Sequence, residues 1–193
     1  MMLLFALVSM SEPPCPAGSL EESLLLEMGR GSQEALAGLY QATSAAVYGF
    51  ALSIVKNVQD AEDIMQDVYL QAYAAAATYR PQGKPMAWVL TITRHLALMR
   101  LRERKRHTAT APADWGLASL DSHQVTDEDR IVLAAAINSL GDEERQIVTL
   151  HALTGMKHRE IAELLDLPLA TVLSKYRRAL IKLKKYLTKE DAQ

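Results

Sequence analysis

Residues 157–185, KHREIAELLDLPLATVLSKYRRALIKLKK, constrain the fold of this chain more than any other stretch. Ile161, Leu164 and Leu165 recur at helical spacing, which predicts a short amphipathic helix. The helix should stop at Asp166-Leu167-Pro168, because proline cannot continue a helix interior and aspartate tolerates a left-handed backbone. We therefore expect two helices separated by a tight turn.

The second of these helices has one apolar side and one basic side. The predicted apolar stripe consists of Val172, Tyr176, Ala179, Leu180, Leu183 and Leu187. The residues left outside it are Thr171, Ser174, Lys175, Arg177, Arg178, Lys182 and Lys185. A helix-turn-helix presents such a second helix to the DNA major groove. A solvated basic helix packed on a shorter one gives the same pattern, so the stretch alone leaves both interpretations open.

The composition favours an all-helical protein. Of the 193 residues, 49% are hydrophobic and only 6% are aromatic, with many alanines and leucines, which prefer helices to strands. The formal net charge is only -2, but the charges are sorted along the chain. Acidic residues dominate 21–73, whereas 94–106 and 175–185 are strongly basic. This sorting suits two partners of opposite charge.

The start of the chain, residues 1–19, is predicted to be a disordered leader because three prolines fall in SEPPCPAGS. The opening MMLLFALVSM is too short to span a bilayer and lacks the features of a secretory signal, so translation starting at Met1 or at Met10 stays open. The single cysteine, Cys15, excludes an internal disulfide and fits a reducing cytoplasm.

The first predicted domain covers residues 20–107. A short helix should end at Gly29-Arg30-Gly31, and a longer helix should begin after Ser32 as its N-cap and close at Asn57. We expect Asp60 to cap the next helix, with Asp63 completing a pair similar to a capping box.

This third helix has a predicted buried stripe of Ala61, Ile64, Met65, Val68, Ala72 and Ala75. Glu62, Asp63, Gln66 and Asp67 remain on its other side. Such an acidic face either meets water or docks a basic partner, and charge alone does not choose between them.

The helix predicted from Pro85 changes character along its length. Its first half, around Trp88, is apolar nearly all round and should be buried, whereas its second half is basic. Six cations between Arg94 and Arg106 exceed what the helix dipole needs and favour contact with phosphates.

Residues 108–127 lose helical periodicity and contain no Lys or Arg, so we interpret them as a flexible linker. A second domain, 128–193, should follow. Ser139 with Asp142 resembles another capping box, and the helix from Asp142 to about Leu153 should support the helix-turn-helix.

Together these segments resemble the bacterial sigma-70 family, specifically the compact extracytoplasmic-function (ECF) sigma factors. The resemblance covers about residues 21–187. Asp60-Ala61-Glu62-Asp63 with Gln66-Asp67-Val68 is similar to the family's DAED-x-x-QDV signature, and 87–102 is similar to its AW-x-x-x-IARN helix. Glu143-Glu144-Arg145, Glu160-Ile161-Ala162 and the residues from Pro168 to Ser174 are similar to its sigma-4 pattern.

The resemblance implies two small helical domains, sigma-2 and sigma-4, with no catalytic activity and no cofactor or metal. It implies that the beta-prime clamp of core RNA polymerase docks on Asp60, Glu62, Asp63, Gln66 and Asp67. It implies that the minus-ten promoter element meets Trp88, Arg94, His95, Arg100, Arg102, Arg104 and Arg106. It implies that the minus-35 element meets Thr171, Ser174, Lys175, Arg177 and Arg178. An anti-sigma factor, often bound to the membrane, is the further partner implied.

The chain departs from the family pattern at several positions. His95 stands where Asn is frequent and Met99 where Asp is frequent, which affects the expected minus-ten preference. Lys157 replaces a frequent capping Ser, and Ala170 and Leu173 replace a common Gly and a common Lys.

Other functions fit the sequence less well. The five histidines are scattered, with no HExxH pair, nucleophile elbow or phosphate loop, so an enzyme is not expected. His151 and His158 are predicted to be surface residues, not metal ligands. The main rival is a free-standing helix-turn-helix regulator with an N-terminal interaction domain. A helical adaptor that binds only proteins would leave both basic patches unexplained.

Overall fold

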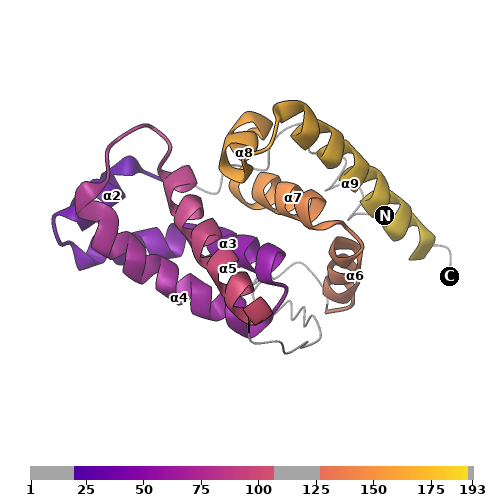
Figure 1. Ribbon diagram of the computed structural model, residues 1–193, viewed down its shortest axis with the longest axis horizontal. Helices are drawn as coiled ribbons and strands as arrows, with labels where there is room; N and C mark the ends of the chain where they lie inside the picture. The colour runs from indigo at the N-terminus through magenta and orange to yellow at the C-terminus, as the bar shows by residue number, and fades with distance from the viewer. Residues whose placement is uncertain (1–19, 107–126, 191–193) are drawn as a thin grey trace. The chain divides into compact units, whose positions relative to one another are not determined.

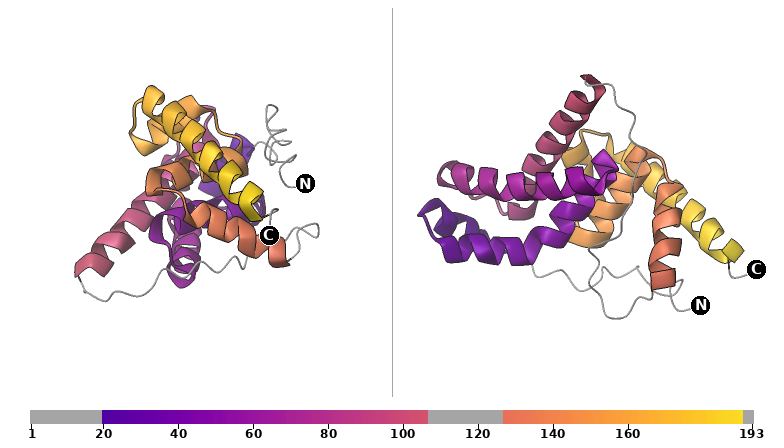
Figure 2. Two further views of the ribbon diagram at one scale, coloured as in Figure 1. Left: turned by 90° about the vertical axis from the view of Figure 1, so that its right-hand side faces the viewer. Right: turned by 90° about the horizontal axis from the view of Figure 1, so that it is seen from below.

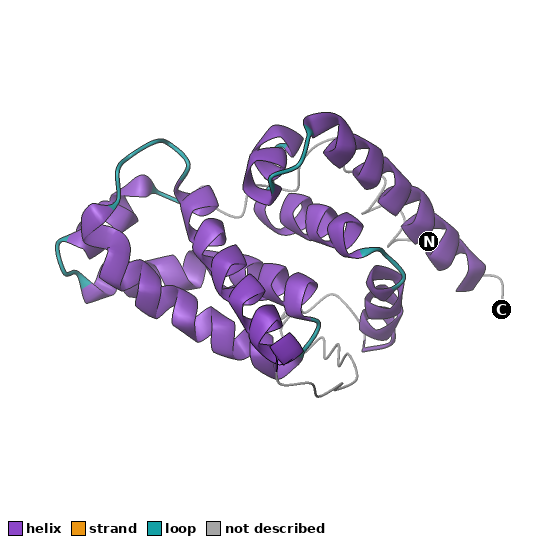
Figure 3. Ribbon diagram, in the orientation of Figure 1, coloured by secondary structure: helices purple, strands orange, loops and turns teal. Residues whose placement is uncertain are grey.

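The computed structural model describes residues 20–106 and 127–190, and all regular secondary structure in these two ranges is helical (Figure 3). The prediction of an all-helical protein with two helical domains is thus confirmed. The described chain falls into two compact units, one on each side of the segment 107–126. The predicted leader and nearly all of the predicted linker lie outside the described residues, so their boundaries stay predictions.

The first unit is built on three long helices that pack against one another (Figures 1 and 2). They are α3 (Gln33–Val55), α4 (Val58–Ala75) and α5 (Pro85–Arg106). The short α2 (Glu22–Gly29) packs on α3 and on the 3-10 helix η1 (Ala76–Thr78). The core side chains with almost no exposed surface include Leu39, Phe50, Ile64, Val68 and Leu90.

The helix starts of this unit confirm one predicted cap and correct another. The Ser32 hydroxyl accepts a hydrogen bond from the Ala35 amide at 3.1 Å, as predicted. Asp60 does not cap α4: the helix begins at Val58, and the Asn57 side chain accepts from the Asp60 amide at 2.9 Å. Lys56 adopts a left-handed backbone, with φ of 55°, which ends α3. Asn57 directly after it becomes the N-cap, so α4 starts before Asp60.

Gly29 of α2 lies close to the backbone of η1. A Cβ placed there would sit 2.8 Å from the Ala76 carbonyl oxygen, which is closer than atoms in contact can lie. We expect Gly29→Ala to lower the free energy of unfolding by about 1–3 kcal/mol, because the backbone of η1 would have to move. Chemical denaturation measures this change.

Gly38→Ala is the matched control for this prediction. Its Cβ would meet only the end of the Leu24 side chain, at 3.2 Å, which can give way more easily than backbone, and an alanine inside a helix gains roughly 0.5–1 kcal/mol over glycine. Equal stabilities of the two variants would contradict the close approach of η1 to α2.

The second unit consists of α6 (Asp127–Asn138), α7 (Asp142–Thr154), α8 (His158–Leu165) and α9 (Leu169–Glu190). Helix α9 packs against the other three. The core side chains of this unit include Ile147, Leu150, Ile161, Val172 and Leu183.

The predicted turn between the two helices of the helix-turn-helix is confirmed. Helix α8 ends at Leu165, Asp166 adopts the left-handed backbone with φ of 57°, and α9 begins directly after Pro168. Val172, Ala179 and Leu183 of the predicted stripe are buried. The sequence therefore predicted both the position of the turn and the face on which α9 packs.

The predicted capping pair of Ser139 and Asp142 is wrong. Gly141 is the N-cap of α7, and its amide donates to the Glu144 carboxylate at 3.1 Å. The Ser139 hydroxyl donates backwards to the Ala136 carbonyl at 2.6 Å, so Ser139 belongs to the end of α6 instead. The three acidic residues at 142, 143 and 144 could each accept a hydrogen bond from the amide that starts α7. The geometry of the turn selects Glu144, because it lies three residues after the N-cap.

Candidate functional site

One side of α4 presents carboxylates around an apolar centre. Gln66 and Asp67 are exposed, and Glu62 and Asp63 are half-buried beside them. Leu70 lies four residues after Gln66 and seven after Asp63, which places it on the same side, and it is 70% exposed. A surface of this kind suits a partner with cations around an apolar patch. We call Glu62, Asp63, Gln66, Asp67 and Leu70 the α4 face.

Sequence reasoning missed Leu70. The predicted buried stripe of α4 contains Ile64 and Val68, and both are buried. Leu70 falls outside that stripe, and a single apolar residue among polar neighbours carried no signal by itself. Its helical spacing from Asp63 and Gln66 could have identified it.

Asp60 is engaged inside its own unit, where its largely buried carboxylate meets two arginines. Its carboxylate accepts hydrogen bonds from Arg100 at 3.3 Å and from Arg104 at 3.1 Å, and its side chain is only 17% exposed. Arg100 also lies 3.6 Å from Asp63. The structure thus brings together residues for which the resemblance implied two different partners.

Four of the remaining predicted residues of α5 lie on its other side. Spacings of seven, seven and four residues join Trp88, His95, Arg102 and Arg106, so these four share one face of the helix. His95, Arg102 and Arg106 are exposed, and Arg94 is half-buried. The half-buried ring of Trp88 meets the ring of Tyr79 edge-on, with centroids 5.1 Å apart. An aromatic ring followed by two exposed guanidinium groups suits a nucleic-acid strand.

The loop before α5 is fixed by a residue that sequence reasoning did not identify. One oxygen of Glu22 accepts hydrogen bonds from the Tyr79 hydroxyl at 2.5 Å and from the amides of Gln82 and Gly83 at 2.9 and 3.0 Å. The bond from Tyr79 lowers the pKa of Glu22, and burial together with Glu22 raises the pKa of Tyr79 to about 12. Glu22 therefore holds the loop that carries Tyr79 beside Trp88.

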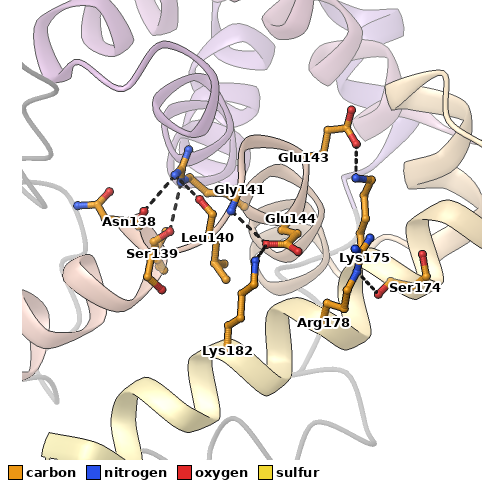
Figure 4. A network of polar contacts seen from close by, with 12 residues as sticks. Asn138, Ser139, Leu140, Gly141, Glu143, Glu144, Ser174, Lys175, Arg178 and Lys182 are labelled. Atoms are coloured by element: carbon orange, nitrogen blue, oxygen red, sulfur yellow. Dashed lines mark hydrogen bonds and ion pairs between the residues drawn. The ribbon is translucent and has the colours of Figure 1, made fainter.

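The outer side of α9 carries the predicted duplex-binding residues. Ser174, Arg177 and Arg178 are exposed, and Thr171 is half-buried. Lys175 points back to α7, where its ammonium lies 2.8 Å from Glu143 (Figure 4). Arg178 donates to the Ser174 carbonyl at 3.4 Å along the same helix. Of the three predicted duplex-binding cations, Arg177 and Arg178 are therefore the exposed ones, and Lys175 is partly engaged inside the unit.

The two residues after Glu143, Glu144 and Arg145, connect α7 to α9 and to α6. The Glu144 carboxylate accepts from Lys182 of α9 at 2.6 Å (Figure 4). Burial opposes the charged form of Glu144, but the bonds from Lys182 and from the Gly141 amide lower its pKa. Arg145 is almost fully buried and donates to the Leu140 carbonyl at 2.7 Å and to Ile137 at 3.3 Å, which closes the end of α6. The Lys182 contact therefore joins α9 to α7, and the Arg145 contacts join α7 to the end of α6.

A cluster of three rings joins α7, α8 and α9. The imidazoles of His151 and His158 stack with centroids 4.8 Å apart, and Tyr176 meets both edge-on at 5.1 and 4.6 Å. His151 Nδ1 lies 2.9 Å from the Met156 carbonyl, whereas the buried His158 Nε2 has no hydrogen-bond partner among the described residues. Both histidines are half-buried, because Tyr176 of α9 packs against their rings, so they are less accessible than the prediction of surface residues implied.

We expect this ring cluster to make the second unit sensitive to acid. Burial and the neighbouring His151 lower the pKa of His158 below its ordinary value of 6.5. The unfolded chain therefore binds a proton more readily than the folded one, and the free energy of unfolding should fall as the pH drops below about 6.5. Hydrogen exchange of the α7–α9 peptides between pH 7.5 and 5, corrected for intrinsic rates, measures this loss.

His158→Gln should remove most of this pH dependence, whereas His95→Gln, at an exposed histidine of the first unit, should leave it unchanged. A wild type whose α7–α9 protection stays constant across this range would contradict the assignment.

The described residues contain no group of three or more His, Cys, Asp or Glu side chains that could hold a metal ion. None of the helices in the described ranges is long and apolar enough to cross a membrane.

Comparison with protein families gives a match to each unit. Residues 39–107 match sigma-70 region 2, and residues 130–183 match sigma-70 region 4. The first match spans the acidic side of α4 and the basic end of α5, and the second spans the helix-turn-helix.

Curated relatives match along nearly the whole chain. An ECF RNA polymerase sigma factor SigK of Mycolicibacterium vanbaalenii is 30% identical, over 86% of this chain and 88% of its own length. A protein of the same name from Mycobacterium ulcerans is 31% identical, over 89% of this chain and 95% of its own.

Two solved structures share the fold. CnrH in complex with the cytosolic domain of CnrY has a TM-score of 0.62 at 22% identity and covers 88% of this chain and 98% of its own. The sigma factor RpoE of Bartonella quintana, in complex with the anti-sigma factor NepR, has a TM-score of 0.61 at 23% identity and covers 79% and 96%. With both regions matched in order and relatives similar over most of their length, the chain belongs to the sigma-70 family, in its extracytoplasmic-function group of RNA polymerase sigma factors.

Proposed function

We propose that this sigma factor docks on core RNA polymerase through the α4 face. The observation that carries the proposal is the combination of carboxylates with the exposed Leu70 on one side of a helix whose other side is buried. Isolated surface carboxylates contribute little to binding, whereas carboxylates around an apolar centre can both steer a basic partner and exclude water from the contact. The beta-prime clamp is the proposed partner.

Promoter DNA is the proposed partner of the two basic surfaces. The exposed side of α5, with Trp88, His95, Arg102 and Arg106, is suited to a separated strand at the minus-ten element, because rings stack on bases and guanidinium groups hold phosphates. The exposed side of α9, with Ser174, Arg177 and Arg178, is suited to the major groove of duplex DNA at the minus-35 element. We propose that the protein acts by binding at these two surfaces and not by catalysing a reaction. We propose that it acts in the cytoplasm, where the polymerase works.

The resemblance of the chain to CnrH and RpoE, which were each solved with a second protein, also supports an anti-sigma factor as a regulatory partner. A pull-down of the tagged chain from its own cells, followed by mass spectrometry, would identify it. Core polymerase subunits recovered in the same experiment provide an internal standard.

Reconstituted transcription tests the proposed function. Adding the purified chain to core polymerase should give transcripts that start at one defined position on a cognate promoter. Core polymerase alone, and core with a Trp88→Ala variant, should give fewer or no such transcripts. A chain that binds promoter DNA tightly by itself but adds no defined start to core polymerase would support the rival interpretation of a free-standing regulator.

A further inference from the structure

Three helices of the first unit meet at the carboxylate of Asp60. Asp60 lies in the first turn of α4 and accepts from Arg100 and Arg104 of α5 at 3.3 and 3.1 Å. Arg104 also donates to the carbonyl of Val55, the last residue of α3, at 3.3 Å. The basic end of α5 is therefore held against the junction of α3 and α4.

This contact divides the cations of α5 into two sets. Arg100 and Arg104 are four residues apart and lie on the side of α5 that meets α4, where about 30% of each side chain is exposed. Arg102 and Arg106 are also four apart, but they lie about half a turn away and are exposed. Because Asp60 holds the inner pair against α4, the outer pair lies on the side of α5 that faces away from α4.

The position of Asp60 fits a structural use better than a docking one. At 17% exposure it is far less accessible than Asp63, at 43%. It also lies at the positive end of the α4 dipole, which stabilises its charge without an external partner. A carboxylate beside two arginines lowers the attraction of this region for phosphate. Direct attraction of DNA therefore does not explain why an aspartate stands at position 60.

Asp63 gives Arg100 a second contact, at 3.6 Å. If a cation of the polymerase forms an ion pair with Asp63, Arg100 still retains its ion pair with Asp60. The arrangement allows the α4 face to dock without releasing the end of α5.

We infer that Asp60 is a positioning residue for promoter opening: it fixes Arg100 and Arg104 so that Arg102 and Arg106 face the separated strand. The inference rests on the proposed function and gives Asp60 a role different from the docking role that the resemblance implied. Asp60 touches neither partner and acts through the orientation of α5.

The test compares Asp60→Asn with Asp60→Glu in holoenzyme reconstituted from the full chain and core polymerase. Asp60→Asn should leave the affinity for core within about twofold and reduce open-complex formation roughly tenfold, because two phosphate contacts lose their alignment. Asp60→Glu, which keeps the charge, should restore most of the activity. Thermal unfolding of each variant sets a working temperature at which all are folded.

Two further variants separate positioning from charge and from stability. Glu103→Gln removes one exposed negative charge from α5 and should not reduce opening. In the Arg102→Gln/Arg106→Gln background, Asp60→Asn should cause no additional loss, because the residues that it positions are already absent. A purely structural role would add its full loss in that background.

Three results would overturn the inference: full opening by Asp60→Asn, a loss of core affinity as large as the loss of opening, or losses that multiply in the double-variant background. A wild-type chain that opens no promoter with core polymerase would contradict the proposed function itself. The first three results leave the wild type active, so the two failures are distinguishable.

Discussion

Glu62→Lys combined with Asp67→Lys is expected to weaken association of the chain with core polymerase by at least about a hundredfold. Each substitution places a cation where we propose that the polymerase presents one, and like charges facing each other across an interface cost roughly several kcal/mol. Neither residue takes part in the Asp60 contacts, so the fold of the first unit should survive. Titration of a fluorescently labelled chain with core polymerase, without DNA, measures the dissociation constant.

The matched control reverses two exposed carboxylates elsewhere in the same unit, Glu27→Lys with Glu103→Lys. It changes the net charge by the same amount and should leave the affinity nearly unchanged. Leu70→Gln changes no charge, and its loss of affinity should persist at high salt, where steering by charge is screened. Equal losses in the two double reversals would mean that net charge, and not the α4 face, controls binding.

Arg177→Ala with Arg178→Ala is expected to produce the second large effect, on binding to the minus-35 duplex. If each arginine contacts a base edge, roughly 1–3 kcal/mol is lost per residue, and discrimination at the contacted base pair relaxes. If they contact only phosphates, the loss is smaller and equal for all sequences, and the salt dependence falls by about one ion per contact. Holoenzyme binding to promoters mutated in the minus-35 element, at several salt concentrations, separates the two cases.

Lys184→Ala is the control for this surface, since it removes an exposed cation from α9 about two turns further along. It should lower affinity slightly and leave sequence discrimination intact. Unchanged promoter occupancy in the Arg177/Arg178 variant would remove α9 from the proposed DNA surface.

The features that the sequence predicted well depend on local chemistry. Asp166 and Pro168 end one helix and start the next whatever surrounds them, and Ser32 caps α3 through an amide three residues away. The stripe of α9 repeats often enough for its buried side to be recognised. In each case, the information lies within one or two turns of the chain.

The features that the sequence could not predict depend on partners far along the chain. Asp60 was expected to cap its own helix, but arginines 40 and 44 residues later take its carboxylate, while Asn57 provides the cap. His151 and His158 seemed isolated until α9 placed Tyr176 against both rings. Charge patterning identified the basic half of α5, but only the packing against α4 divides its arginines into an inner and an outer pair.

The most direct test of this account is equilibrium binding of the wild-type chain to core RNA polymerase at low and rising ionic strength, in the absence of promoter DNA. We predict a one-to-one complex whose affinity falls with salt but persists at physiological ionic strength, and which the Glu62→Lys/Asp67→Lys variant does not form. Failure of the wild-type chain to bind core polymerase even at low salt would contradict the account.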